Sequence, residues 1–159
     1  MTLETIIGDL FEADTRFIAH QCNCITQKAA HLSAAMFERF PYANCYKGRT
    51  TPDQPGTIQI RGNGADQRFV INCFGQGWPG KPKYPDSVQD GFEARKRYFH
   101  SCLKEIAKIP APQSIGFPHG IGCGAAGGDW TWYEKQLEKF AAFVGETGAR
   151  VVIYKLEDK

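Results

Sequence analysis

A glycine-rich stretch from Phe117 to Trp130 carries the strongest chemical signal in the sequence. It reads Phe-Pro-His-Gly-Ile-Gly-Cys-Gly-Ala-Ala-Gly-Gly-Asp-Trp, with a short apolar run before it and a helical pattern after it. Its five glycines and two alanines allow a ligand to approach the backbone N–H groups closely. The following helix N-terminus adds partial positive charge, and phosphate is the usual guest of this arrangement. We therefore expect a phosphate-binding loop, with a flexible surface loop as the alternative.

Three histidines are candidates for acid–base catalysis, because an unperturbed imidazole titrates near neutral pH. His31 lies in a polar segment after a predicted strand, His20 lies at the end of that strand, and His119 lies in the glycine-rich stretch. His31 is the best placed of the three. The alternatives are an exposed first-turn helix residue for His31, a strand-end residue satisfied by the backbone for His20 and a loop-shaping residue for His119.

Further polar side chains fit a role at the same site. Asp129 could orient or deprotonate a water molecule, but its position also suits a helix cap, which we favour. Lys28 could pair with a phosphate or be an ordinary solvated lysine. Gln76 and Trp78 could contact a sugar or a base, although Trp78 also suits the rim of the core.

Composition limits the class of protein. The 159 residues are 42% hydrophobic and 13% aromatic, which favours one packed domain spanning residues 1–159. No apolar run approaches the roughly 20 residues of a membrane helix, and the first residues lack a signal-peptide pattern, so we expect a cytoplasmic protein, or a nuclear one in a eukaryote. The net charge of +2 does not indicate a nonspecific nucleic-acid binder. A cluster of basic residues is either a local positive patch or a solvated face: Lys47, Arg49, Lys81 and Lys83.

The six cysteines are scattered, and none forms a Cys-x-x-Cys pair. This spacing argues against a zinc finger or ribbon, and the apolar surroundings of several cysteines favour reduced thiols. We expect no metal site and no cofactor.

The pattern of apolar residues predicts alternating strands and helices. Strands are expected at 2–8, 16–22, 57–61, 69–74, 114–117 and 150–156, with helices at 30–39, 87–108 and 131–147. A hairpin turn is expected at 62–66. In the longest helix, Val88 begins the apolar face, and Thr131 with Glu134 fits a capping box for the last helix. The order predicts an α/β fold with a mostly parallel sheet and helices on both faces.

Three short motifs resemble those of the macro domain family of ADP-ribose-binding modules. They are Gly8-Asp9-Leu10-Phe11 after the first strand, Ile18-Ala19-His20-Gln21-Cys22-Asn23 along the second, and Pro118 with Gly120-Ile121-Gly122-Cys123-Gly124 in the glycine-rich loop. The resemblance spans nearly the whole chain and implies a three-layer α/β/α fold with a mixed, mostly parallel central sheet. The nearest subgroup contains glutamate-deblocking terminal ADP-ribose hydrolases and ADP-ribose 1''-phosphate phosphatases.

The resemblance also implies roles for individual residues. Asp9, next to Leu10, would accept a hydrogen bond from the adenine amino group, and Asn23 would face the distal ribose. The backbone of Gly120 to Ala126 would hold the diphosphate, which adds Ala125 and Ala126 to the predicted ligand-binding residues together with His20 and Gln76. The predicted catalytic residues are His31, Asp129, Asn23 and Lys28.

The sequence departs from the subgroup at two places. The glutamate-deblocking hydrolases use a lysine after the fourth strand, where this chain has Phe74-Gly75-Gln76, and an aspartate near the position of Ala126. Catalysis through a lysine adduct is therefore not implied, and other groups must act. Three functions remain open: an ADP-ribosyl hydrolase, which we favour, an ADP-ribose 1''-phosphate phosphatase, and a noncatalytic reader. The expected partner is ADP-ribose or an ADP-ribosylated macromolecule, and the expected state is a monomer without membrane contact.

Overall fold

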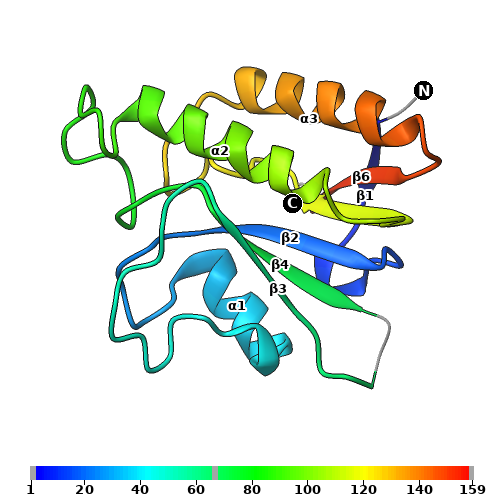
Figure 1. The fold of residues 1–159 in the computed structure, drawn as a ribbon, viewed down its shortest axis with the longest axis horizontal. Helices are drawn as coiled ribbons and strands as arrows, with labels where there is room; N and C mark the ends of the chain where they lie inside the picture. Colours follow the sequence, from blue (N-terminus) through cyan, green and yellow to red (C-terminus); the bar gives the residue numbers. More distant parts are fainter. Residues whose placement is uncertain (1–2, 66–67, 158–159) are drawn as a thin grey trace.

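A computed structural model describes residues 3–65 and 68–157 (Figure 1). Six strands and three α-helices make up its regular structure, together with two short 3-10 turns. The strands are β1 (Leu3–Ile7), β2 (Phe17–Cys22), β3 (Ile58–Arg61), β4 (Phe69–Phe74), β5 (Ser114–Pro118) and β6 (Arg150–Lys155). The helices are α1 (His31–Arg39), α2 (Phe92–Ile106) and α3 (Trp130–Gly145), and the 3-10 turns are η1 (Leu10–Glu12) and η2 (Pro41–Ala43).

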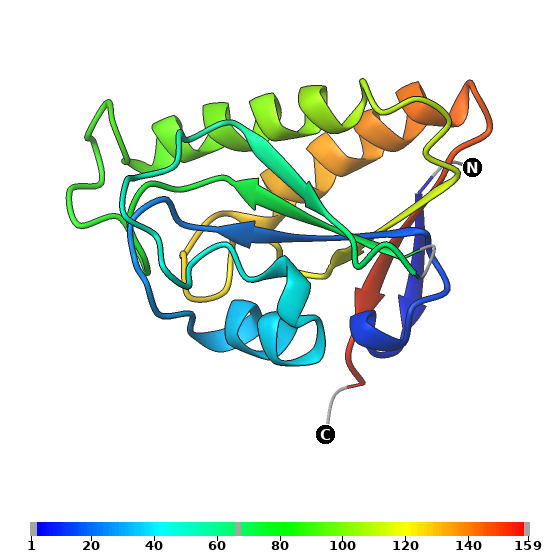
Figure 2. The same cartoon turned by 60° about the horizontal axis from the view of Figure 1, so that its bottom comes forward.

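The strands form one sheet in the order β1-β6-β5-β2-β4-β3. All neighbouring pairs are parallel except β3 with β4, so the predicted mixed, mostly parallel sheet is confirmed. Helices α2 and α3 cover one face and α1 covers the other, which gives the predicted three-layer arrangement (Figures 1 and 2). The predicted hairpin of β3 and β4 is confirmed, but part of its turn, predicted at 62–66, lies outside the described residues.

Each face of the sheet has its own core, and strand alternation assigns residues to them. In β2, Phe17 and Ala19 pack in the core under α2 and α3, whereas Ile18 and Cys22 pack in the core under α1. The even-numbered position between the latter two, His20, therefore points to the α1 side. Both cores are needed because a parallel sheet is stable only when both faces are covered.

Helix α2 begins five residues later than predicted, at Phe92 instead of position 87. The Ser87 hydroxyl accepts hydrogen bonds from the backbone N–H groups of Gln89 and Asp90, which favours a turn over a helix. Gly91 completes this turn, because a Cβ there would lie 2.4–2.7 Å from the backbone atoms of Pro85 and Ser87. Val88 is consequently 76% exposed and does not belong to the apolar face of the helix.

Helix α3 is capped differently from the prediction. Its N-cap is Asp129, whose Oδ1 accepts a hydrogen bond of 3.1 Å from the N–H of Thr131. The capping box predicted from Thr131 and Glu134 is therefore wrong, and the capping role favoured for Asp129 is confirmed. An aspartate at this position also stabilises the positive end of the helix dipole.

The sheet order creates a switch point between β5 and β2. The chain passes from β2 to β4 on one side and then returns through α2 to place β5 on the other side of β2. Ligands of open α/β sheets bind beyond the carboxyl ends of the strands at such a point.

Among the helices that the structure describes, none is long and apolar enough to cross a membrane.

Candidate functional site

A cavity of about 460 Å³ opens at the carboxyl ends of β2, β4 and β5, at the switch point of the sheet. Three loops form its wall: the one after β2, the one after β4 and the glycine-rich one after β5. Most of the predicted site residues line it, namely Asn23, Lys28, His31, Gln76, Gly120, Ile121, Gly122, Cys123, Gly124, Ala125 and Ala126. The topology thus brings together segments that lie about a hundred residues apart in the sequence.

The glycine-rich loop presents backbone to this cavity. Gly120 and Gly122 both have φ of 79°, a conformation that favours glycine. A Cβ added to Gly120 or Gly124 would meet no protein atom within 4 Å, whereas one on Gly122 would lie 2.6 Å from the Tyr133 ring. The open space beside Gly120 and Gly124 is therefore space that a ligand can occupy against bare main chain.

The N–H groups of this loop divide into two sets. Those of Ile121, Cys123, Gly127 and Gly128 donate to carbonyl oxygens within the turn itself. None of these bonds uses the remaining N–H groups, which belong to Gly120, Gly122, Gly124, Ala125 and Ala126. Consecutive N–H donors beside a cavity, followed by the N-terminus of α3, are suited to bind a negatively charged group.

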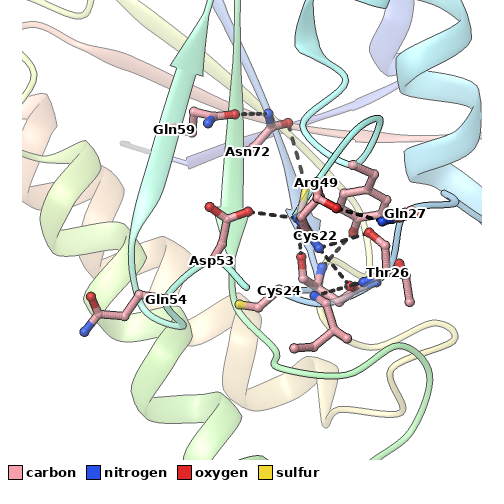
Figure 3. Close-up of polar contacts among 12 residues, drawn as sticks. Cys22, Cys24, Thr26, Gln27, Arg49, Asp53, Gln54, Gln59 and Asn72 are labelled. Atoms are coloured by element: carbon pink, nitrogen blue, oxygen red, sulfur yellow. Dashed lines mark hydrogen bonds and ion pairs between the residues drawn. The ribbon is translucent and has the colours of Figure 1, made fainter. Parts of the chain in front are cut away.

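The loop after β2 is held by a buried arginine (Figure 3). Arg49 is only 8% exposed, so it is not part of a solvated face or of a surface patch. Its guanidinium donates to the carbonyl oxygens of Asn23 and Thr26, each at 3.1 Å, and pairs with Asp53 at 2.9 Å. It also lies over the ring of Tyr46, at 4.6 Å from the ring centre. These contacts fix the segment in which the first predicted catalytic residues occur.

The side-chain carboxamide of Asn23 forms hydrogen bonds within its own loop. Its Oδ1 accepts hydrogen bonds of 2.9 Å from the N–H groups of Ile25 and Thr26, and its Nδ2 donates to the Thr26 hydroxyl at 3.0 Å. This is an Asx turn, in which the side chain replaces a backbone group. Asn23 lines the cavity, but its carboxamide shapes the turn.

His31 has an unusual backbone conformation at the cavity wall. Its φ is 55°, in the left-handed region that non-glycine residues rarely adopt, and its side chain is exposed. Such strain is kept mostly where a side chain is needed at that place. Lys28 lines the same cavity and is also exposed.

The loop after β4 is fixed to the glycine-rich loop by Arg95 of α2. This side chain is 2% exposed and donates to the carbonyl oxygens of Gly80 at 2.6 Å, Trp78 at 3.1 Å and Ala126 at 3.5 Å. Asp90 pairs with Arg95 and accepts from the N–H groups of Gly77 and Trp78. Arg95 thus links the loop after β4 to the glycine-rich loop through hydrogen bonds to both.

No protein-family model matches the sequence, and no curated protein matches it either. Solved structures match almost the whole chain. The macrodomain of Mycobacterium tuberculosis DarG is 21% identical, with a TM-score of 0.71 over 96% of both chains. The macrodomain of Thermus aquaticus DarG is 21% identical, with a TM-score of 0.66 over 98% of both chains. A mutant of the Oceanobacillus iheyensis macrodomain, solved with ADPR, is 19% identical, with a TM-score of 0.67 over 99% of this chain and 86% of that one.

This chain has the macrodomain fold. The three motifs that resemble the family occupy the carboxyl edge of its sheet: one follows β1, one runs along β2 and one follows β5. The predicted subgroup stays a prediction.

Four predicted site residues lie outside the cavity of this macrodomain fold: Asp9, Leu10, His20 and Asp129. Asp9 is exposed, lies at the same sheet edge after β1, and caps η1 by accepting a hydrogen bond of 2.8 Å from the N–H of Phe11. Leu10 is 5% exposed and packs in the core on the α1 side, so its side chain has a structural role. Asp129 caps α3 and its carboxylate is directed at the helix N-terminus.

His20 is fully buried on the α1 face of the sheet. Its Nε2 lies 2.5 Å from Oδ1 of Asn72 and its Nδ1 lies 3.2 Å from the Ser33 hydroxyl. Burial lowers the pKa of His20 to about 4, so the ring is neutral at pH 7. The prediction allowed a satisfied strand-end residue, but its partners are side chains and not the backbone.

Several cavity residues were not predicted, among them Gln21, Ser33 and Tyr46. Gln21 alternates with His20 along β2 and ends at the cavity, where its Nε2 donates to Oε1 of Gln76 at 2.6 Å. Strand alternation could have identified it. Ser33 lies two residues after His31, and no sequence pattern distinguishes it from an ordinary helix serine. His119, a candidate that remained open, lines the cavity with its ring 4.7 Å from that of Trp130.

Cys123 is a further titratable group on the wall. Burial raises the pKa of its thiol to about 12, so it is protonated and a poor nucleophile at pH 7. All six cysteines are free thiols. Among residues 3–65 and 68–157, no group of histidine, cysteine and carboxylate side chains is arranged to hold a metal ion.

Proposed function

We propose that this protein binds ADP-ribose and removes it from a modified protein or nucleic acid by attack of water at C1''. The observation that carries the proposal is the set of N–H donors of Gly120, Gly122 and residues 124–126, which face an open cavity at the switch point of a macrodomain fold. A macrodomain of the same fold was solved with ADPR, which supports this ligand class.

The ligand would span the edge of the sheet. In the proposed orientation, the diphosphate lies on Gly120 to Ala126, and the adenine lies toward Asp9, beyond β5 and β6. Asp9 Oδ1 caps η1, and the second carboxylate oxygen makes none of the described hydrogen bonds, so it can accept one from an amino group. The distal ribose then lies in the opposite direction, against the loop that contains Lys28 and His31.

His31 is the proposed acid–base residue, because it is the exposed histidine on the wall where the distal ribose would lie. The loop supplies positioning, since it fixes the diphosphate and thereby C1''. Asp129 has no part in the proposed reaction, because its carboxylate caps α3 away from the cavity.

A phosphatase acting on ADP-ribose 1''-phosphate is the second candidate. Lys28 and His31 line the same wall, and a cation with an imidazole suits a departing phosphate. Turnover of the 1''-phosphate but not of ADP-ribosylated protein or nucleic acid would favour this activity. Absence of turnover on all three, with binding retained, would favour a noncatalytic reader.

Binding is tested by nuclear magnetic resonance and calorimetry with ADP-ribose. Amide signals at 120–126 are expected to shift, and Asp9→Ala is expected to weaken binding by roughly tenfold, the loss of about one hydrogen bond. Asp9→Ser keeps an oxygen that can cap η1 but shortens the reach to adenine, so it separates the two roles. Glu146→Ala, an exposed acidic position after α3, is the control. Unmoved amides at millimolar ADP-ribose would refute the proposal.

A further inference from the structure

A buried pair of side chains lies directly behind the cavity wall. His20 of β2 and Asn72 of β4 are register partners in the parallel sheet, and both are 0% exposed. Their side chains point to the α1 face, where Nε2 of His20 lies 2.5 Å from Oδ1 of Asn72. A buried polar pair destabilises the fold unless its hydrogen bonds are satisfied, so we expect every polar side-chain atom of the two residues to have a hydrogen-bond partner.

The hydrogen bonds of Asn72 determine which nitrogen of His20 carries the proton. Nδ2 of Asn72 donates to the carbonyl oxygen of Ala43 at 2.9 Å. It also donates to Oε1 of Gln59 at 3.2 Å (Figure 3). Both amide protons are therefore used, and Oδ1 is the atom that faces His20. Because an amide oxygen only accepts, the proton is on Nε2, and Nδ1 carries a lone pair.

Ser33 connects that lone pair to the cavity. Its Oγ lies 3.2 Å from Nδ1 of His20 and also 3.2 Å from the carbonyl oxygen of Gln21. The hydroxyl rotates, so its proton can be donated to either acceptor while the oxygen remains an acceptor. Ser33 lies in the first turn of α1 and lines the same cavity wall as His31.

We propose that Ser33, His20 and Asn72 form a hydrogen-bond relay that orients the attacking water, an inference that rests on the hydrolase function proposed above. Asn72 holds His20 in the tautomer whose Nδ1 accepts the Ser33 proton, so Oγ of Ser33 presents a lone pair to the water. This water attacks C1'' as the bond from C1'' to the acceptor breaks, and the acceptor leaves with the electron pair. His31 takes the proton of the water and gives a proton to the departing acceptor.

The surroundings of His20 keep the ring neutral. Burial lowers its pKa to about 4, so at neutral pH Nδ1 is unprotonated and accepts the hydrogen bond from Ser33. Cys22 of β2 faces the ring with Sγ 3.5 Å from Nε2, and burial raises the pKa of that thiol well above its usual value, so it stays neutral. Helix α1 contributes Ser33 and the edge of the Phe37 ring. No charged side chain is among these described contacts.

The test compares turnover with binding in variants of the full chain. Substrates are ADP-ribosylated protein, ADP-ribosylated nucleic acid and ADP-ribose 1''-phosphate. Ser33→Ala is expected to lower kcat by roughly tenfold, the loss of about one hydrogen bond to the attacking water, and to leave the Kd for ADP-ribose within about threefold. Ser33→Thr keeps the hydroxyl and is expected to retain turnover. Ser101→Ala, the same change at an exposed position of α2, is the matched control with unchanged kcat.

A second measurement does not depend on turnover. Nitrogen chemical shifts of His20 in the wild-type protein should report a neutral ring protonated on Nε2 at pH 7. A ring protonated on Nδ1, or equal kcat for Ser33→Ala and the wild type, would overturn the relay while leaving the hydrolase function standing. If the wild type binds ADP-ribose but releases it from none of the substrates, the hydrolase function fails and the relay with it.

Discussion

Arg95, which is buried, and Asp90, which is partly buried, form an ion pair with Nη2 of the arginine 2.8 Å from Oδ2 of the aspartate. The pair lies between the loop after β4 and the glycine-rich loop, and its members bond to backbone atoms of both. Its position explains why a loop rich in glycine and proline keeps one shape at the cavity, since the loop is bonded to a helix and not only to itself.

Removal of Arg95 should therefore affect both stability and binding. Arg95→Ala removes the buried arginine, leaves the partly buried Asp90 carboxylate without its cation, and is expected to lower the free energy of unfolding by about 3–5 kcal/mol. Chemical denaturation measures this change, and calorimetry should find weaker ADP-ribose binding in the folded fraction. Glu93→Ala breaks the surface pair with Lys96 and should change stability by no more than about 0.5 kcal/mol. Equal changes in the free energy of unfolding for the two variants would contradict the idea that Arg95 holds the two loops together.

Gly124 offers a test of the cavity that leaves the fold intact. Its φ is not in the left-handed region and a Cβ there would meet no protein atom, so Gly124→Val should keep the wild-type melting temperature. The new side chain enters the space proposed for the diphosphate, and we expect at least a roughly tenfold loss of ADP-ribose affinity by calorimetry. Wild-type affinity in a folded Gly124→Val variant would place the ligand elsewhere.

Substitutions at His31 can distinguish the effect of its strained backbone on stability from the effect of its imidazole on turnover. With φ at 55°, glycine suits this position better than alanine, so His31→Gly should be more stable than His31→Ala by about 1 kcal/mol. Both variants lose the imidazole and should lower turnover by roughly tenfold or more with nearly unchanged ADP-ribose affinity. His100→Ala, on the exposed side of α2, is the control. If turnover in the two His31 variants stays at the wild-type level, the residue has no catalytic role.

His20 makes stability depend on pH. Its pKa is about 4 in the folded protein against 6.5 for an unperturbed histidine, so the unfolded chain binds more protons between these values. The stabilisation is complete above pH 6.5 and is lost as the pH falls toward 4, by about 3 kcal/mol in total. Denaturation of the wild type and of His20→Gln across this range isolates the contribution, since glutamine does not titrate. Parallel curves for the two proteins would contradict the assignment.

The fold was largely predictable because its signals are local. The apolar run of β2 and the glycines between β5 and α3 follow from a few adjacent residues, and alternation along the chain implies the layers. Arg49 and Arg95 were not predictable as buried residues, because an arginine is usually exposed and their partners are distant. Arg95, for example, bonds to Ala126, 31 positions away. The same limit applies to the relay, since only strand register places His20 beside Asn72.

At the site, residue type predicted more than side-chain direction. Asn23 and Asp129 lie at the predicted ends of their strand and helix, yet their oxygens bond to neighbouring backbone N–H groups. Short polar side chains compete for such local donors, and sequence alone does not show which partner prevails.

The position of Cys123 makes it possible to measure whether the cavity is occupied. Its half-buried thiol is part of the glycine-rich wall, while Cys22, Cys73 and Cys102 are sealed in the two cores. At alkaline pH an alkylating reagent would have to enter the space proposed for the ligand. The rate of labelling at Cys123, distinguished by mass spectrometry from the half-buried Cys45, would therefore report how often the groove stands empty.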